Sequence, residues 1–169
     1  MLMASSRLPA AAALLTLLLP VAQAADFTIN MVDAKPLTLS QYKGHPVVLA
    51  FILTSCPHCQ NAVKVLSKLQ NEYGPRGLQV LASAIEQDAQ LHVRLFVKNF
   101  APPFPVGYNT GAEPYTLIHP TGKVPMMPLL GFIDKKGILR AQHEGEEPFF
   151  NDLEQNLRKE IEALFQTKK

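Results

Sequence analysis

Residues 47–59 read VVLAFILTSCPHC, and this stretch decides the fold. Its first seven residues are apolar and rich in β-branched side chains, which is typical of a strand buried on both faces in a parallel sheet. An amphipathic pattern begins at Cys56, places Ala62, Leu66, Leu69 and Tyr73 on one face, and stops at Gly74-Pro75. The stretch therefore predicts a buried strand followed directly by a helix.

Cys56 and Cys59 are the only two cysteines of the chain, and both lie at the start of this predicted helix. A thiol there meets unpaired backbone N–H groups and the positive end of the helix dipole, which favour the reactive thiolate form. The spacing brings both sulfurs to one face, close enough to bond. Because the ring is very short, such a bond adds little loop-closure stability, so it suits redox exchange better than structural cross-linking. A zinc half-site is the other alternative, but the chain has no second CxxC.

The N-terminus has the pattern of a secretory signal. Arg7 precedes an apolar stretch from Leu8 to Val21, and Ala22-Gln23-Ala24 fits the small-x-small cleavage pattern. We therefore expect a signal peptide over residues 1–24 and one exported domain over residues 25–169. An uncleaved membrane anchor is the alternative, although the stretch is short for a bilayer span. The formal net charge of +2 gives no support for nucleic-acid binding.

The rest of the chain predicts an α/β domain with the element order βαβαββα after a short N-terminal extension. The pattern of the extension predicts a short edge strand over Asp26–Val32. A proline-rich segment, residues 102–105, fits neither a helix nor a central strand. The remaining predicted elements are a strand at Leu78–Ile85, a helix at Ala89–Phe100, a hairpin of strands at Leu129–Asp134 and Ile138–His143, and a helix at Pro148–Phe165.

Three stretches, residues 39–49, 54–59 and 124–137, resemble the exported thioredoxin-like proteins of the TlpA/ResA group. The resemblance implies a thioredoxin-like fold, in which helices flank a central mixed sheet, and a periplasmic location. It also implies thiol–disulfide exchange with protein clients through a mixed disulfide, without a bound cofactor. A membrane-bound redox partner is expected to reset the cysteine pair. Nothing resembles the dimerisation domain of disulfide isomerases, so we expect a monomer.

The sequence departs from this family in ways that leave the redox direction open. Ser55 stands where the family often has Trp, and Ala50 stands where cytosolic thioredoxins bury an Asp. The dipeptide Pro57-His58 is the one found in the periplasmic oxidase DsbA, whereas the interval from Cys59 to Pro128 is too short for the helical insertion of DsbA. The dipeptide favours oxidation of clients, and the family resemblance favours their reduction.

The CxxC motif suggests a role for each of its residues. Cys56 is the candidate nucleophile and the more exposed sulfur, while Cys59, one turn further in, is expected to be buried and to resolve the mixed disulfide. His58 is expected to stabilise the Cys56 thiolate, which would make the disulfide more oxidising, as stabilisation of the reduced form does in the periplasmic oxidase DsbA. A solvated surface histidine is the alternative. Pro57 restrains the helix start, where its missing N–H costs nothing.

The resemblance assigns three further residues. Pro128 is the candidate cis-proline whose loop binds an extended client segment, with Pro125 as the competing position and an ordinary trans loop as the alternative. Met127 is then expected to lie against the sulfurs as a soft apolar contact. Glu86, at the end of the second strand, is a candidate to take the proton from Cys59, and a solvated loop residue is the alternative.

Two other function classes remain as alternatives. A peroxidase is disfavoured because Leu53 and Leu49 occupy the positions where peroxiredoxins place Thr and Pro before the reactive cysteine. A copper carrier would bind Cu(I) through the two thiolates, His58 and the Met126-Met127 pair, although related copper-assembly proteins space their cysteines more widely.

Overall fold

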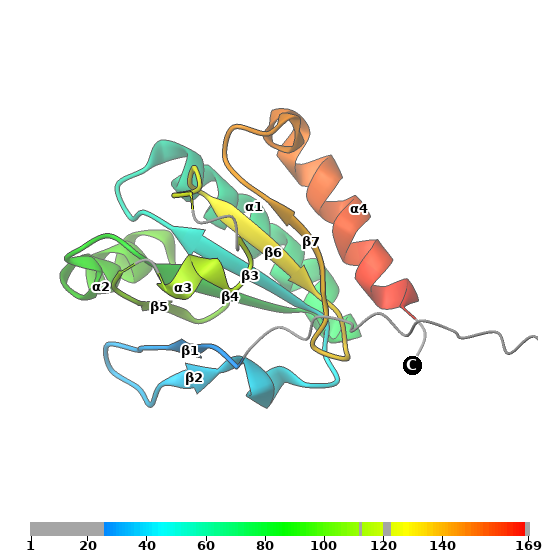
Figure 1. The fold of residues 1–169 in the computed structure, drawn as a ribbon, viewed down its shortest axis with the longest axis horizontal. Helices are drawn as coiled ribbons and strands as arrows, with labels where there is room; N and C mark the ends of the chain where they lie inside the picture. The colour runs from blue at the N-terminus through cyan, green and yellow to red at the C-terminus, as the bar shows by residue number, and fades with distance from the viewer. Residues whose placement is uncertain (1–25, 112, 120–122, 168–169) are drawn as a thin grey trace, which may run out of the picture.

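The computed structural model describes residues 26–111, 113–119 and 123–167, and its centre is a five-stranded mixed sheet (Figure 1). The strand order is β5-β4-β3-β6-β7, where β3, β4 and β5 run parallel, and β6 and β7 each run antiparallel to their inner neighbour. The strands are β3 (Val47–Ile52), β4 (Gln79–Ala84), β5 (Val106–Tyr108), β6 (Leu129–Ile133) and β7 (Leu139–His143). The predicted thioredoxin-like α/β fold is confirmed. The expected signal peptide, residues 1–24, lies outside the described residues.

Three long helices cover one face of the sheet: α1 (Pro57–Tyr73), α2 (Ala89–Phe100) and α4 (Leu153–Gln166). Both parallel crossovers step in the same direction along the sheet, so the right-handed rule places α1 and α2 on the same side. Val48, Ala50 and Ile52 of β3 point to this side and are fully buried in one core cluster with residues of all three helices. No helix in the described part of the chain is long and apolar enough to cross a bilayer.

The opposite face is covered by smaller elements: β1 (Thr28–Ile29), β2 (Leu37–Thr38), the 3-10 turn η1 (Leu39–Tyr42) and α3 (Glu113–Thr116). The odd-numbered residues of β3, Val47, Leu49 and Phe51, lie in a second core cluster on this side. Every residue of β3 is therefore buried, as its unbroken apolar run predicted.

The N-terminal extension differs from the predicted edge strand over Asp26–Val32. Thr28–Ile29 pairs with Leu37–Thr38 in a separate two-stranded sheet, and Asn30 forms only an isolated bridge to Tyr108. The edge position is occupied by β5, which the sequence did not predict because proline precedes it and it is only three residues long. Gly107 permits the close approach, since a Cβ there would lie 2.3 Å from the carbonyl oxygen of Asn30.

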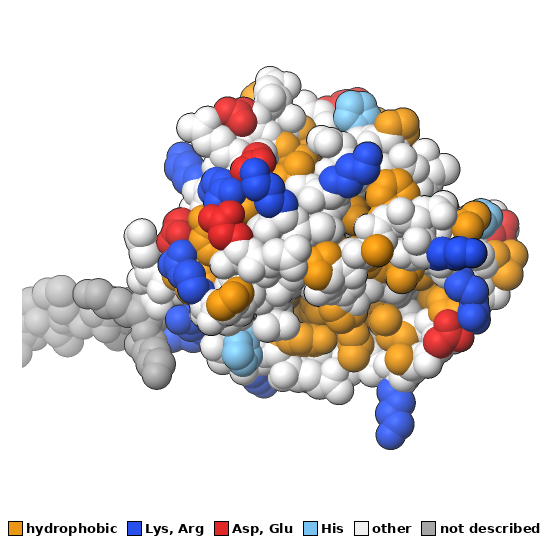
Figure 2. All heavy atoms as spheres, turned by 180° about the vertical axis from the view of Figure 1, so that it is seen from behind, with side chains coloured by type: hydrophobic (Ala, Val, Ile, Leu, Met, Phe, Trp, Pro, Cys, Tyr) orange, Lys and Arg blue, Asp and Glu red, His pale blue; other side chains and the backbone are white. Residues whose placement is uncertain are grey.

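Helix α2 has the predicted bounds, and its two leucines do not lie on its inward face. Ala89, Val93 and Phe96 are buried, whereas Leu91 and Leu95 are 69% and 60% exposed. Figure 2 shows the back of the view in Figure 1, which is the side that the long helices cover. Apolar side chains are exposed across the middle and lower part of this side. Exposed leucines one helical turn apart are unusual for a solvated face, and they lie beside the candidate site described below.

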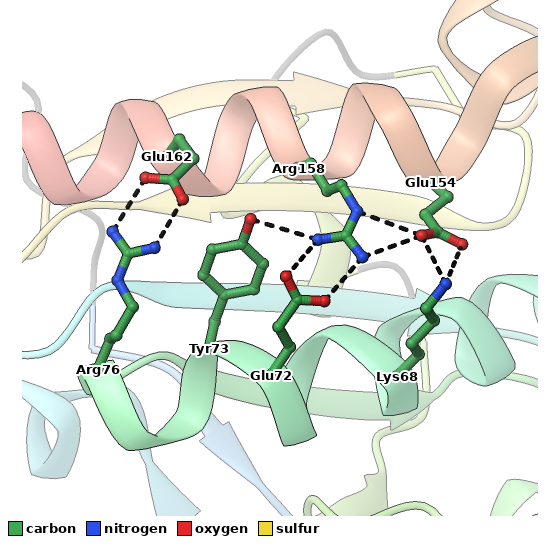
Figure 3. A network of polar contacts seen from close by, with 7 residues as sticks. All are labelled: Lys68, Glu72, Tyr73, Arg76, Glu154, Arg158 and Glu162. Carbon is green, nitrogen blue, oxygen red and sulfur yellow. Dashed lines mark hydrogen bonds and ion pairs between the residues drawn. The ribbon is translucent and has the colours of Figure 1, made fainter.

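The C-terminal helix begins with the 3-10 turn η3 (Pro148–Asp152) and continues as α4. Ion pairs on its exposed side connect it to α1 and to η2 (Gly74–Arg76), the 3-10 turn that follows α1 (Figure 3). The contacts are Lys68–Glu154, Glu72–Arg158, Arg76–Glu162 and a hydrogen bond from Arg158 to the Tyr73 hydroxyl. Because these groups face solvent, each pair adds little stability by itself, and the network mainly fixes the register of α4 on α1.

Candidate active site

Cys56 occupies the N-cap position of α1, and Pro57 is the first helical residue. The backbone of Cys56 is extended, with φ −78° and ψ 121°, and its C=O accepts the first helical hydrogen bond from Gln60 N at 3.0 Å. Its own N–H donates to the carbonyl oxygen of Leu53 at 3.1 Å. This turn leaves the Cys56 side chain half-buried at the junction of β3 and α1, at the positive end of the helix dipole, although its sulfur makes no capping hydrogen bond.

Cys59 lies one turn into α1 and is fully buried. Burial raises the pKa of the Cys59 thiol to about 12, against the opposing effect of the Leu53 N–H, which lies 3.4 Å from the sulfur. The neighbouring Cys56 and the charge of Glu86 raise this pKa further. Both cysteines are free in this structure, so at neutral pH Cys59 is a protonated thiol that needs a base before it can attack.

Glu86 follows β4 by two residues and reaches back to the turn before Cys56. Its Oε1 accepts a hydrogen bond from Thr54 N at 3.0 Å and a short one from the Thr54 hydroxyl. His92 Nδ1 approaches the same oxygen at 3.8 Å. Oε2 is buried and has no hydrogen-bond partner among the described residues. Thr54 therefore fixes one carboxylate oxygen and leaves the other available, within electrostatic range of Cys59.

The peptide bond between Met127 and Pro128 is cis, at the position that the sequence predicted. Pro125 and Pro128 are buried, whereas Val124 and Met126 are 78% and 50% exposed. Met127 is half-buried and packs against both core clusters, and the first of these clusters contains Cys59 and borders Cys56. The proline loop therefore lies in the same apolar neighbourhood as the cysteine pair.

His58 is exposed to solvent between the two cysteines. The structure thus places every predicted site residue at one end of the sheet, around the start of α1. Sequence reasoning missed Thr54, the partner of Glu86, and Gln60, whose side chain donates to the Thr54 carbonyl at 3.0 Å. The only sign of these two residues in the sequence is that each has a polar side chain within two positions of the CxxC motif.

A groove of about 410 Å³ also escaped prediction, and it runs from the Glu86 carboxylate along α2. Its apolar wall includes the exposed Leu91 and Leu95, and its polar end includes Thr54 and Gln60. In the part of the chain that the structure describes, no group of three or more His, Cys, Asp or Glu side chains is arranged to hold a metal ion.

A thioredoxin-like sheet that presents a CxxC pair at a helix start, beside a cis-proline loop, defines a thiol–disulfide oxidoreductase. The known relatives agree with this class. The chain belongs to the AhpC/TSA family, whose model matches residues 20–142. Within that family its relatives include thiol–disulfide oxidoreductases of the ResA type, as the sequence resemblance suggested.

One such relative is thiol-disulfide oxidoreductase ResA of Bacillus thuringiensis subsp. konkukian, which is 28% identical over 81% of this chain and 76% of its own length. The thioredoxin-like protein YneN of Bacillus subtilis is 30% identical over 73% of this chain and 70% of its own length. Among solved structures, a putative thioredoxin from Neisseria meningitidis superposes with a TM-score of 0.69 at 26% identity, covering 86% of this chain and 91% of that one.

Proposed function

We propose that this enzyme is a periplasmic thiol–disulfide oxidoreductase that exchanges a Cys56–Cys59 disulfide with the thiols of protein clients through a mixed disulfide. The observation that carries the proposal is the unequal burial of the two sulfurs: Cys56 is half-buried and Cys59 fully buried. A client can reach the first sulfur and not the second, so Cys56 forms the mixed disulfide and Cys59 resolves it.

In the reducing direction, the Cys56 thiolate attacks one sulfur of a client disulfide, and the other client sulfur leaves as a thiolate that takes up a proton. Cys59 then loses its proton and attacks the sulfur of Cys56, which releases the second client thiolate and closes the enzyme disulfide. Two electrons pass from the enzyme to the client. Oxidation of a client is the same sequence run backwards, so the enzyme needs no bound cofactor in either direction.

Glu86 is the proposed base for the resolving step. The pKa of Cys59, about 12, makes spontaneous deprotonation rare at neutral pH. The Oε2 of Glu86 is a buried acceptor without a hydrogen-bond partner among the described residues, close enough to raise the pKa of the Cys59 thiol by its charge, and we propose that one water molecule relays the proton between them. Thr54 holds the carboxylate in place through its N–H and hydroxyl.

Changing Glu86 to Gln separates this role from a purely electrostatic one. The negative charge of Glu86 raises the pKa of Cys59, so its removal alone makes Cys59 easier to deprotonate and resolution faster. Loss of a base makes resolution slower, by about 10²-fold at neutral pH and less at alkaline pH. Stopped-flow measurement of mixed-disulfide decay across pH distinguishes the two. An unchanged or faster decay in Glu86→Gln contradicts the proposed role.

His58 is the proposed determinant of redox poise. A protonated imidazole or ring N–H beside the Cys56 sulfur stabilises the reduced form and raises the reduction potential. We therefore expect His58→Ala to lower the reduction potential by about 30 mV, the equivalent of a tenfold change in the equilibrium constant for this two-electron couple. Equilibration with glutathione measures it. His45→Ala, which changes an exposed histidine bonded to the Gly77 carbonyl on another part of the surface, is the control. Equal potentials for wild type and His58→Ala remove this role.

The proposed periplasmic location rests on the signal pattern of residues 1–24, and the proposed membrane-bound redox partner on the family resemblance. The enzyme is proposed to act as a monomer. Whether it oxidises or reduces its clients is decided by that partner, and the redox state of Cys56 and Cys59 in living cells reports it. A peroxidase has no support at the site, because Leu49 and Leu53 offer no side-chain group to polarise a peroxide.

A further inference from the structure

The loop that follows β7 is bonded to the backbone of the cis-proline loop. Glu144 Oε2 accepts a hydrogen bond from Met126 N at 2.9 Å. Gly145 N donates to the carbonyl oxygen of Met126, also at 2.9 Å. Gly145 lies so close that a Cβ would be 2.6 Å from the Met127 carbonyl oxygen. Both backbone groups of Met126 are thus occupied from this one side.

The next residue in the proline loop is left free. Neither the N–H nor the C=O of Met127 has a hydrogen bond to any described residue. Pro128 has no N–H, and both backbone groups of Met126 are already bonded, so Met127 supplies the donor–acceptor pair next to the cis-proline that an incoming strand can use. The exposed side chain of Met126 and that of Val124 offer apolar contacts beside it.

Glu144 is itself held by a second set of contacts. Its N–H donates to Glu147 Oε1 at 3.1 Å, and its C=O accepts from Glu147 N at 2.9 Å. The other oxygen of Glu147 is 2.7 Å from His143 Nδ1, and the His143 ring stacks on Phe149 at 3.8 Å. The Glu144 carboxylate that reaches Met126 therefore extends from a turn that hydrogen bonds and ring stacking hold in place, so its position is well defined.

We propose that Glu144 is a positioning residue that adapts this enzyme to extended polypeptide clients. By fixing Met126, it presents the Met127 backbone to a client segment that adds as a short strand next to Cys56. This inference rests on the proposed exchange function and adds the residue that holds the client-binding loop in position. A small disulfide with no amide groups makes no use of Met127, so its reaction does not depend on Glu144.

Two substrates with the same leaving group test the proposal. One is a peptide of about ten apolar and polar residues in alternation, with a central cysteine linked to 2-nitro-5-thiobenzoate. The other is the 2-nitro-5-thiobenzoate disulfide of 2-mercaptoethanol. In both, the Cys56 thiolate attacks the alkyl sulfur and releases the coloured thiobenzoate, and Cys59 then displaces the peptide or mercaptoethanol thiol.

For Glu144→Ala we expect kcat/KM on the peptide to fall about tenfold, mainly through a higher KM, because one charge-assisted hydrogen bond is lost. The rate with the mercaptoethanol disulfide stays as in wild type. Glu144→Gln keeps an acceptor oxygen and retains most of the peptide activity. Glu146→Ala, which removes the neighbouring exposed glutamate, changes neither rate. Glu144→Asp keeps the charge but is one methylene shorter, and it replaces the alanine variant if that variant unfolds.

The possible outcomes separate this inference from the proposed function. If Glu144→Ala and Glu144→Asp slow both substrates equally, or slow neither, Glu144 does not select polypeptides and the inference is wrong. If the wild-type protein itself reacts with neither substrate through Cys56, the exchange function fails.

Discussion

Changing Cys56 to Ser is expected to abolish thiol–disulfide exchange, with turnover of a client disulfide reduced about a thousandfold or more. Cys56 is the sulfur at the helix start that a client can reach, and it forms every covalent intermediate in the proposed cycle. A serine hydroxyl fits the same N-cap position but is not ionised there, so the fold is retained while the nucleophile is lost. Turnover of a fluorogenic disulfide-linked peptide by catalytic amounts of enzyme, with excess dithiothreitol as reductant, measures the effect.

Ser55→Ala is the matched control for this change, because it alters the exposed neighbouring residue without touching either sulfur. We expect it to keep nearly full activity. A Cys56→Ser variant that retained more than a small fraction of wild-type turnover would show that Cys59 attacks clients directly, and the assignment of the two sulfurs would be wrong.

Changing Cys59 to Ala is expected to have an equally large effect of a different kind. The mixed disulfide, which Cys56→Ser cannot form, accumulates. In this variant Cys56 still attacks the client, but no resolving thiol displaces it. Alanine is the better replacement, since serine would bury a hydroxyl at a fully buried position without a designed partner. With equimolar client disulfide, we expect most of the variant to migrate as a covalent complex on a non-reducing gel, against a trace for wild type.

The complex must depend on Cys56, so the double variant Cys56→Ala/Cys59→Ala is expected to form none. A client that leaves the Cys59→Ala enzyme as fast as it leaves wild type would mean that resolution does not involve Cys59.

The parts of this fold that the sequence predicts are those in which local pattern and tertiary burial agree. The apolar run of β3 could only be buried on both faces, and the helix after it begins where Cys56 and Pro57 allow. The hairpin of β6 and β7 follows from its glycine turn in the same way. The candidate site was predictable because most of its reactive residues lie at the junction of β3 and α1. Pro128 was predicted from the family resemblance.

Contacts between distant segments could not be read from the sequence in this way. The strand β5 forms because its backbone pairs with the free edge of β4. The exposure of Leu91 and Leu95 depends on which side of α2 packs against the sheet. The bond from Met126 N to Glu144 joins residues eighteen apart whose side-chain types give no hint of it. Helical spacing in α2 fits more than one inward face, and only packing against Val106 and its neighbours selects Val93 and Phe96.

Selective alkylation of the reduced protein tests the central claim, the inequality of the two thiols, most directly. The protein is treated with iodoacetamide at neutral pH for increasing times, and peptide mass spectrometry follows each cysteine. We expect Cys56 to be modified at least about a hundredfold faster than Cys59, because the latter is buried and its pKa is about 12. Equal rates for the two cysteines, or faster modification of Cys59, would contradict the account.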